Sequence, residues 1–106
     1  MSSPTVETAS LLATIDAHRA ALESVLARDG ATNPRLFGSV ARGEAGSQSD
    51  IDVLVDLAPN GSNALLQLAG IGEEFGVILG TRVDVVSSDI LRDPVSRTAM
   101  SDAIPL

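Results

Sequence analysis

Apolar residues recur at helical spacing through the first part of the chain, from about Val6 to Arg28. The recurring positions are Leu11, Ile15, Leu22, Val25 and Leu26. This spacing predicts one long amphipathic helix, ended by Asp29-Gly30 with Gly30 as a left-handed cap. The single His, His18, falls on or beside the apolar side of this helix. We expect it to be a partly buried packing residue rather than a general base.

Three short apolar segments further along predict strands over residues 35–37, 50–57 and 81–86. A turn at Asn33-Pro34 precedes the first of them. In the second, apolar and acidic positions alternate, so Ile51, Val53, Val55 and Leu57 share one face of the strand and Asp50, Asp52, Leu54 and Asp56 share the other. An apolar face packed on a core, opposite a polar one, is typical of a strand covered by helices on one side.

Helical patterns fill the intervals between these strands. Ser39 to Glu44 predicts a brief helix, and Ser62 is the expected N-cap of a longer one that ends near Leu79. Gly70, Gly72 and Gly76 weaken that helix by about 1 kcal/mol each relative to Ala. They either permit close packing on the sheet or break the helix. A last helix is expected to begin near Pro94.

This order of elements predicts an α/β (α+β) fold, with a small mixed sheet, helices packed on one face and the carboxylates on the opposite, open face. We expect residues 1–106 to form one domain, with 1–4 as a loose tail. The sequence is 44% apolar but has two Phe and no Trp or Tyr, so the core is expected to be aliphatic.

Composition excludes several classes of function. The net charge is −7 and all seven basic residues are Arg, so a basic track for direct nucleic-acid binding is not expected. Without Lys or Cys, covalent lysyl-nucleotide and thiol chemistry are excluded. No apolar run approaches the roughly 20 residues that span a bilayer, and no signal-peptide pattern begins the sequence. We expect a cytoplasmic protein that does not associate with membranes.

The candidate chemistry lies at two linked motifs. Gly38-Ser39 ends the first strand, and ten residues separate Ser39 from Asp50-x-Asp52. The two carboxylates point to one side, about 6.6 Å apart along the strand, an arrangement suited to Mg²⁺ with substrate phosphates. Backbone N–H groups at the strand-to-helix corner would hold a phosphate. The motifs therefore predict a site for a metal-bound nucleoside triphosphate, the alternative being that the carboxylates are solvated strand-edge charges.

The string Phe37-Gly38-Ser39-Val40-Ala41-Arg42-Gly43-Glu44, followed by Ser49-Asp50-Ile51-Asp52, resembles the signature of the polymerase-β-type nucleotidyltransferase superfamily. It looks most like the minimal members, the MNT domains, which are commonly antitoxins paired with HEPN toxins. The resemblance implies a nucleotidyltransferase fold and a third carboxylate, Asp84, on the neighbouring strand. It also implies that Asp50, Asp52 and Asp84 are catalytic and hold two Mg²⁺ ions.

The same resemblance implies that Gly38, Ser39 and Arg42 bind the nucleotide, with ATP as substrate. Arg42 either reaches a phosphate, pairs with Glu44 or Asp50, or is a surface residue. Asp84 is alternatively a structural partner of Arg82 or Arg35.

The expected function is an Mg²⁺-dependent antitoxin that transfers AMP from ATP to a tyrosine of a partner HEPN toxin. The chain has no Tyr of its own, so modification in trans would fit. The alternative is a binding module that neutralises its toxin by complex formation without catalysis. Asp56, about 13 Å along the strand from Asp52, is expected to be solvated.

Overall fold

The computed structural model describes residues 5–41, 43, 46, 50–57, 63–87 and 103–106. Its elements, in chain order, are α1 (Val6–Ala17), α2 (Arg19–Arg28), β1 (Ala31–Phe37), α3 (Gly38–Ala41), β2 (Ile51–Leu57), α4 (Ala64–Leu79), β3 (Val83–Ser87) and β4 (Ile104–Pro105). The expected tail 1–4 and the helix expected near Pro94 lie outside the described residues.

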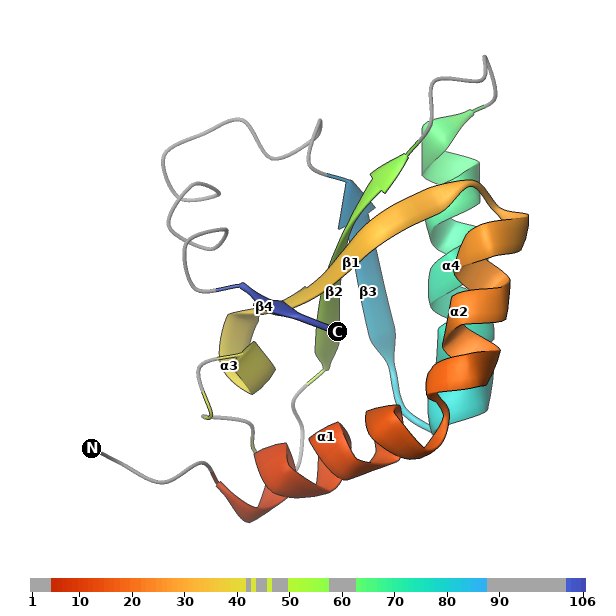
Figure 1. Ribbon diagram of the computed structural model, residues 1–106. Coiled ribbons are helices and arrows are strands. Elements are labelled where there is room, and N and C mark those ends of the chain that lie inside the picture. Colours follow the sequence, from red (N-terminus) through yellow and green to blue (C-terminus); the bar gives the residue numbers. More distant parts are fainter. Residues whose placement is uncertain (1–4, 42, 44–45, 47–49, 58–62, 88–102) are drawn as a thin grey trace, which may run out of the picture.

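The strands form one mixed sheet in the order β3-β2-β1-β4. β2 pairs with β3 in parallel, and β1 pairs with both β2 and β4 in antiparallel fashion. Helices α2 and α4 lie side by side against one face of the sheet, and α1 runs across the end of this layer (Figure 1). The predicted fold class, a small mixed sheet with helices on one face, is confirmed.

The core lies between β2 and the two covering helices. Ile51, Val53 and Val55 are 0–1% exposed, and they pack in one cluster with Leu22 of α2 and Phe75 of α4. The alternation along β2 therefore assigns its apolar face to the core, as predicted. Leu54, on the opposite face, is also 0% exposed. The expectation that the carboxylate face is open is therefore wrong at this position.

The long helix predicted over residues 6–28 is wrong in one respect, because the chain bends at His18 and forms two helices. His18 has φ −111°, its backbone N–H reaches carbonyls of the preceding turn, and its Nδ1 donates to the Thr14 carbonyl at 2.9 Å. The ring is exposed, which overturns the prediction of a packing residue. The apolar spacing continues across the bend, so periodicity alone does not reveal it.

Strand β1 begins at Ala31, four residues earlier than predicted, and passes through Asn33 and Pro34 without a turn. A β-bulge between Thr32 and Arg35 shifts the register against β2, and Asn33 adopts φ +52° there. A bulge accommodates a residue that would otherwise break the pairing, and Pro34, which lacks an N–H, is tolerated at such a point.

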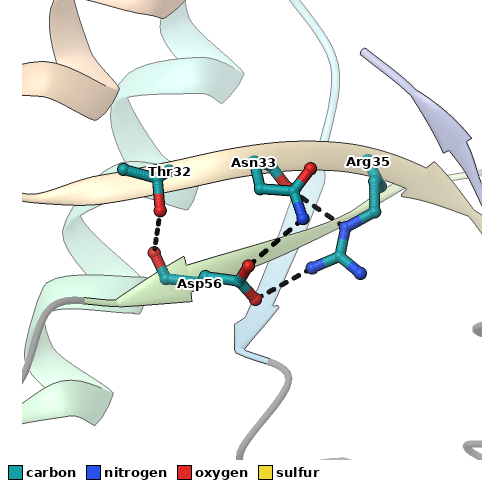
Figure 2. Close-up of polar contacts among 4 residues, drawn as sticks. All are labelled: Thr32, Asn33, Arg35 and Asp56. Atoms are coloured by element: carbon teal, nitrogen blue, oxygen red, sulfur yellow. Dashed lines mark hydrogen bonds and ion pairs between the residues drawn. The ribbon is translucent and has the colours of Figure 1, made fainter.

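The bulge is held by Asp56 of β2 (Figure 2). Asp56 accepts hydrogen bonds from Arg35 Nη2 at 2.9 Å and Asn33 Nδ2 at 3.2 Å, and Thr32 Oγ1 donates to its backbone carbonyl at 3.3 Å. Arg35 Nε also donates to the Asn33 carbonyl at 3.1 Å. The expectation that Asp56 is merely solvated is therefore wrong.

Helix α4 is capped by Asn63, whose Oδ1 accepts from the N–H groups of Leu65 and Leu66 at 3.0 and 3.3 Å. The predicted cap, Ser62, lies outside the described residues. Two glycines allow the helix to approach β3. A Cβ on Gly72 would lie 3.0 Å from the Val83 carbonyl oxygen, and one on Gly76 would lie 3.2 Å from that of Thr81. These glycines therefore serve close packing and do not break the helix.

None of the helices in the described part of the chain is both long and apolar enough to cross a membrane.

Candidate active site

Asp52 and Asp84 lie directly opposite each other on the parallel strands β2 and β3. Their sequence neighbours Ile51, Val53 and Val83 are buried in the core, so both carboxylates project from the sheet face away from the helices. Adjacent strands are about 4.8 Å apart, which brings the two side chains within reach of a shared ligand. The sequence-based placement of Asp84 beside the Asp-x-Asp strand thus agrees with the structure.

Asp50 comes immediately before β2, and the backbone fixes its position. The N–H of Ile51 donates to the Arg82 carbonyl at 3.0 Å, which joins the entry of β2 to the entry of β3. The Arg82 side chain returns across this junction. Its Nε lies 3.6 Å from Asp50 Oδ2 and 3.7 Å from Asp84 Oδ1.

Arg82 was one of two candidate partners of Asp84 that the sequence left open. Pairing with Asp84 was one alternative and is observed, whereas its simultaneous contact with Asp50 was not foreseen. The other suggested partner, Arg35, pairs with Asp56 at the far end of β2. The available signal was the position of Arg82 two residues before Asp84, because alternate strand residues point to one side.

Gly38 occupies the corner between β1 and α3, next to Asp52. Phe37 and Asp52 are register partners, Gly38 has φ +72°, and a Cβ at this position would overlap Asp52 Oδ2. Only a residue without a side chain fits both the backbone conformation and the space. The Ser39 side chain and the whole of Arg42 lie outside the described residues.

The N-terminus of α1 reaches the segment that follows α3. The Thr5 N–H donates to the Gly43 carbonyl at 3.0 Å, while Thr5 caps α1 by accepting from the Thr8 N–H. The Thr8 hydroxyl is buried and contacts Thr5 Oγ1 at 2.8 Å. The start of helix α1 is therefore joined to the segment that follows α3.

The predicted metal ligands suit Mg²⁺ in kind, since all three offer carboxylate oxygens on one face of the sheet. Within the described residues, however, no three acidic, His or Cys side chains gather closely enough to share one ion. Asp50 and Asp84 face Arg82, and Asp52 faces Gly38. The backbone positions fit a metal centre, and side-chain rotation would have to complete it.

A cavity of about 900 Å³ lies at the edge strand β3, and residues of both faces of β3, of α4 and of β2 line it, Asp52 and Asp84 among them. Its polar rim includes Asp52, Asp84, Arg82 and Glu73. Its apolar wall comprises Phe37, Leu65, Leu68, Ala69, Gly72, Gly76, Val83, Val85 and Val86. A mostly apolar cavity with a few charged groups in its lining is the usual form of a small-molecule or side-chain binding site.

The small mixed sheet with helices on one face matches the fold of a minimal nucleotidyltransferase. Residues 19–106 match the nucleotidyltransferase domain family, and the chain belongs to that family. Helix α1 precedes the matched region. The family and the enzyme class expected from the resemblance are thereby confirmed.

The chain is similar to the protein adenylyltransferase MntA of Thermococcus cleftensis, with 36% identity over 69 residues, 65% of this chain and 68% of the relative. A solved minimal nucleotidyltransferase matches with a TM-score of 0.74 and 42% identity, over 90% of this chain and 95% of that one. A crystal structure of a toxin–antitoxin with AMP-PNP shares the fold, with a TM-score of 0.63 and 21% identity over 79% and 68% of the two chains.

Proposed function

We propose that this protein is an Mg²⁺-dependent adenylyltransferase that transfers AMP from ATP to a tyrosine of a HEPN-type toxin, and so acts as an antitoxin. The observation that carries the proposal is the opposition of Asp52 and Asp84 on parallel strands, with Asp50 and Gly38 beside them. The name of the Thermococcus relative, a protein adenylyltransferase, supports a protein acceptor. The toxin–antitoxin neighbour with AMP-PNP supports ATP and a toxin partner.

In this reaction the tyrosine oxygen attacks the α-phosphorus of ATP. The bond to the bridging oxygen of pyrophosphate breaks, and the tyrosine loses its proton. Asp50, Asp52 and Asp84 would hold two Mg²⁺ ions, which neutralise charge on the attacking and leaving oxygens when bound. Asp84 would also accept the tyrosine proton. Holding the reactants in line supplies a further part of the rate enhancement.

Gly38, Ser39 and Arg42 are proposed to hold the triphosphate. Gly38 contributes through its backbone, which can approach a phosphate closely because no side chain intervenes. The acceptor tyrosine would enter through the cavity at the edge strand β3, whose lining includes apolar side chains together with Asp52 and Asp84. An aromatic ring with one polar end suits such a wall.

A second candidate is a binding module that neutralises its toxin by complex formation alone. The observation that favours it is the apolar outer side of α4, where Leu65, Leu66 and Val77 are 68%, 71% and 81% exposed. A contiguous exposed apolar patch is typical of a protein–protein contact, and Leu65 and Leu66 are adjacent at the start of α4.

The deciding measurement is transfer from α-³²P-ATP in Mg²⁺ to the protein encoded beside this one. We expect label on the neighbour, reduced at least about 100-fold by Asp52→Asn, because the charge that holds the metal is lost. Asp16→Asn is the matched control, since Asp16 is exposed and pairs with Arg19 away from the site. An Asp52→Asn protein that labels normally contradicts the proposal. If neither wild type nor Asp52→Asn labels the neighbour, although the neighbour co-purifies with both, the alternative of a binding module is correct.

A further inference from the structure

Arg82 lies where a cation bound by the acidic site would lie. Its Nε is 3.6 Å from Asp50 and 3.7 Å from Asp84, so one guanidinium spans the entries of β2 and β3. The side chain is 74% exposed and forms part of the rim of the cavity. The guanidinium is therefore held by its two ion pairs, while most of the side chain is exposed to solvent and can change its rotamer.

The other described arginines are committed elsewhere. Arg19 pairs with Asp16, Arg28 with Glu74 and Arg35 with Asp56, none of them at the site. Asp50, Asp52 and Asp84 place three negative charges on neighbouring strand positions, and like charges this close destabilise one another. Arg82 offsets that repulsion for two of the three carboxylates.

We propose that Arg82 is a displaceable counter-ion of the acidic centre, one that competes with the first divalent cation and departs when the cation binds. The inference rests on the carboxylate site of the proposed function. A divalent cation bound to Asp50 and Asp84 would place two positive charges a few ångströms from the positively charged guanidinium. Their repulsion would drive the Arg82 side chain away. An exposed ion pair costs little to break, so the competition is modest and reversible.

The competition also sets the order of loading. A cation that arrives alone must displace Arg82 into water. A cation that arrives with a triphosphate brings phosphate oxygens, to which a guanidinium can bind in bidentate fashion. Arg82 therefore weakens binding of the free cation but not of the cation–triphosphate complex. The protein would in this way avoid filling its site with a metal that carries no substrate.

The test is Mn²⁺ binding followed by electron paramagnetic resonance, a readout that needs no catalysis. Without nucleotide, we expect Arg82→Gln to bind Mn²⁺ about 2- to 5-fold more tightly than wild type, the range that loss of an exposed ion pair allows. Arg82→Lys, which keeps the charge, should stay within about twofold of wild type. With AMP-PNP added, the gap between wild type and Arg82→Gln should close.

Arg28→Gln is the matched control, because it removes the same single charge from an exposed ion pair away from the site. A comparable gain of Mn²⁺ affinity in that variant would show an effect of net charge and overturn the inference. Equal binding by Arg82→Gln and wild type would also overturn it, and Arg82→Met provides a second neutral variant if Arg82→Gln does not fold. Absence of Mn²⁺ binding in every variant would reject both this inference and the proposed metal centre. If Arg82 competes with Mn²⁺ as expected but no AMP is transferred to a neighbour, the proposed adenylylation is rejected and the inference about Arg82 stands.

Discussion

The carboxylate of Asp52 lies against the Cα of Gly38, in the space that a side chain at position 38 would fill. A Cβ built there would overlap Asp52 Oδ2 and lie 3.3 Å from its Cγ. The corner that ends β1 and the acidic residue of β2 are therefore fitted to one another. The Gly-Ser motif and the Asp-x-Asp motif are separated in sequence, but in the structure they form a single contact.

Substitution of Gly38 by Ala should damage the site more than the fold. We expect at least a 10-fold loss of nucleotidyl transfer, because the methyl group must push Asp52 aside, together with about 1–2 kcal/mol of destabilisation from the left-handed backbone. Gly80→Ala is the control, since Gly80 has φ +71° and open space around it. Full activity in Gly38→Ala, measured on the neighbouring protein, would contradict this account.

Substitution of Gly72 by Ala should destabilise the protein by about 1–3 kcal/mol, because a methyl group would press on the Val83 carbonyl at 3.0 Å. Gly70→Ala, on the same helix with nothing within 4 Å, should instead stabilise it by about 0.5–1 kcal/mol. Urea denaturation of the two variants measures the difference. Equal effects of the two substitutions would mean that α4 does not depend on close approach to β3.

Removal of the Asp56 carboxylate should loosen the bulge in β1. Asp56→Ala leaves Arg35, whose side chain is 19% exposed, without its partner, and we expect about 1–3 kcal/mol of destabilisation. Mn²⁺ affinity should change little, since Asp56 is at the far end of β2 from Asp50. Thermal unfolding measures the loss of stability, and Mn²⁺ titration followed by electron paramagnetic resonance measures the affinity. A large loss of Mn²⁺ binding in a folded Asp56→Ala protein would place Asp56 in the site.

The ion pair between Arg28 and Glu74 should contribute equally at every pH near neutrality. The hydrogen bond from Arg28 to Glu74, and then their charge attraction, raise the pKa of Arg28 above its ordinary value. A raised basic pKa gives stability that is complete below the unfolded-state pKa and is lost only as pH rises through the folded-state value. The difference in Tm between wild type and Arg28→Gln should therefore be constant from about pH 6 to about pH 9. A Tm difference that falls steadily across this range would refute a contribution of the Arg28–Glu74 pair that is independent of pH.

Much of the fold and of the candidate site followed from local pattern. The alternation of Ile51, Val53 and Val55 with acidic residues placed the core on one face and Asp52 on the other. The placement of Asp84 on the strand beside Asp52 came instead from the resemblance to nucleotidyltransferases, and the parallel pairing of β2 and β3 agrees with it. The two faces of β2 were predictable because the alternation of side chains along a strand is a property of neighbouring residues.

What the sequence did not predict depends on contacts between distant residues. The bend at His18 interrupts no apolar spacing, and the bulge at Asn33 is held by Asp56, on another strand, which accepts hydrogen bonds from Asn33 and Arg35. Arg82 could be aligned with Asp84 from its spacing, but its contact with Asp50 requires β2 and β3 to be adjacent. Each of these features is created by folding rather than encoded in a short segment.

The close fit of α4 on β3 ties the acidic centre to the folding of one unit. Asp52 and Asp84 become neighbours only when β2, α4 and β3 have assembled, because α4 is the connection that carries the chain from one strand to the other (Figure 1). A polypeptide in which this unit is open has its three carboxylates but no site. Catalytic competence would then appear in a refolding experiment at the moment when the crossover closes, and transfer activity would serve as a kinetic probe of that single event.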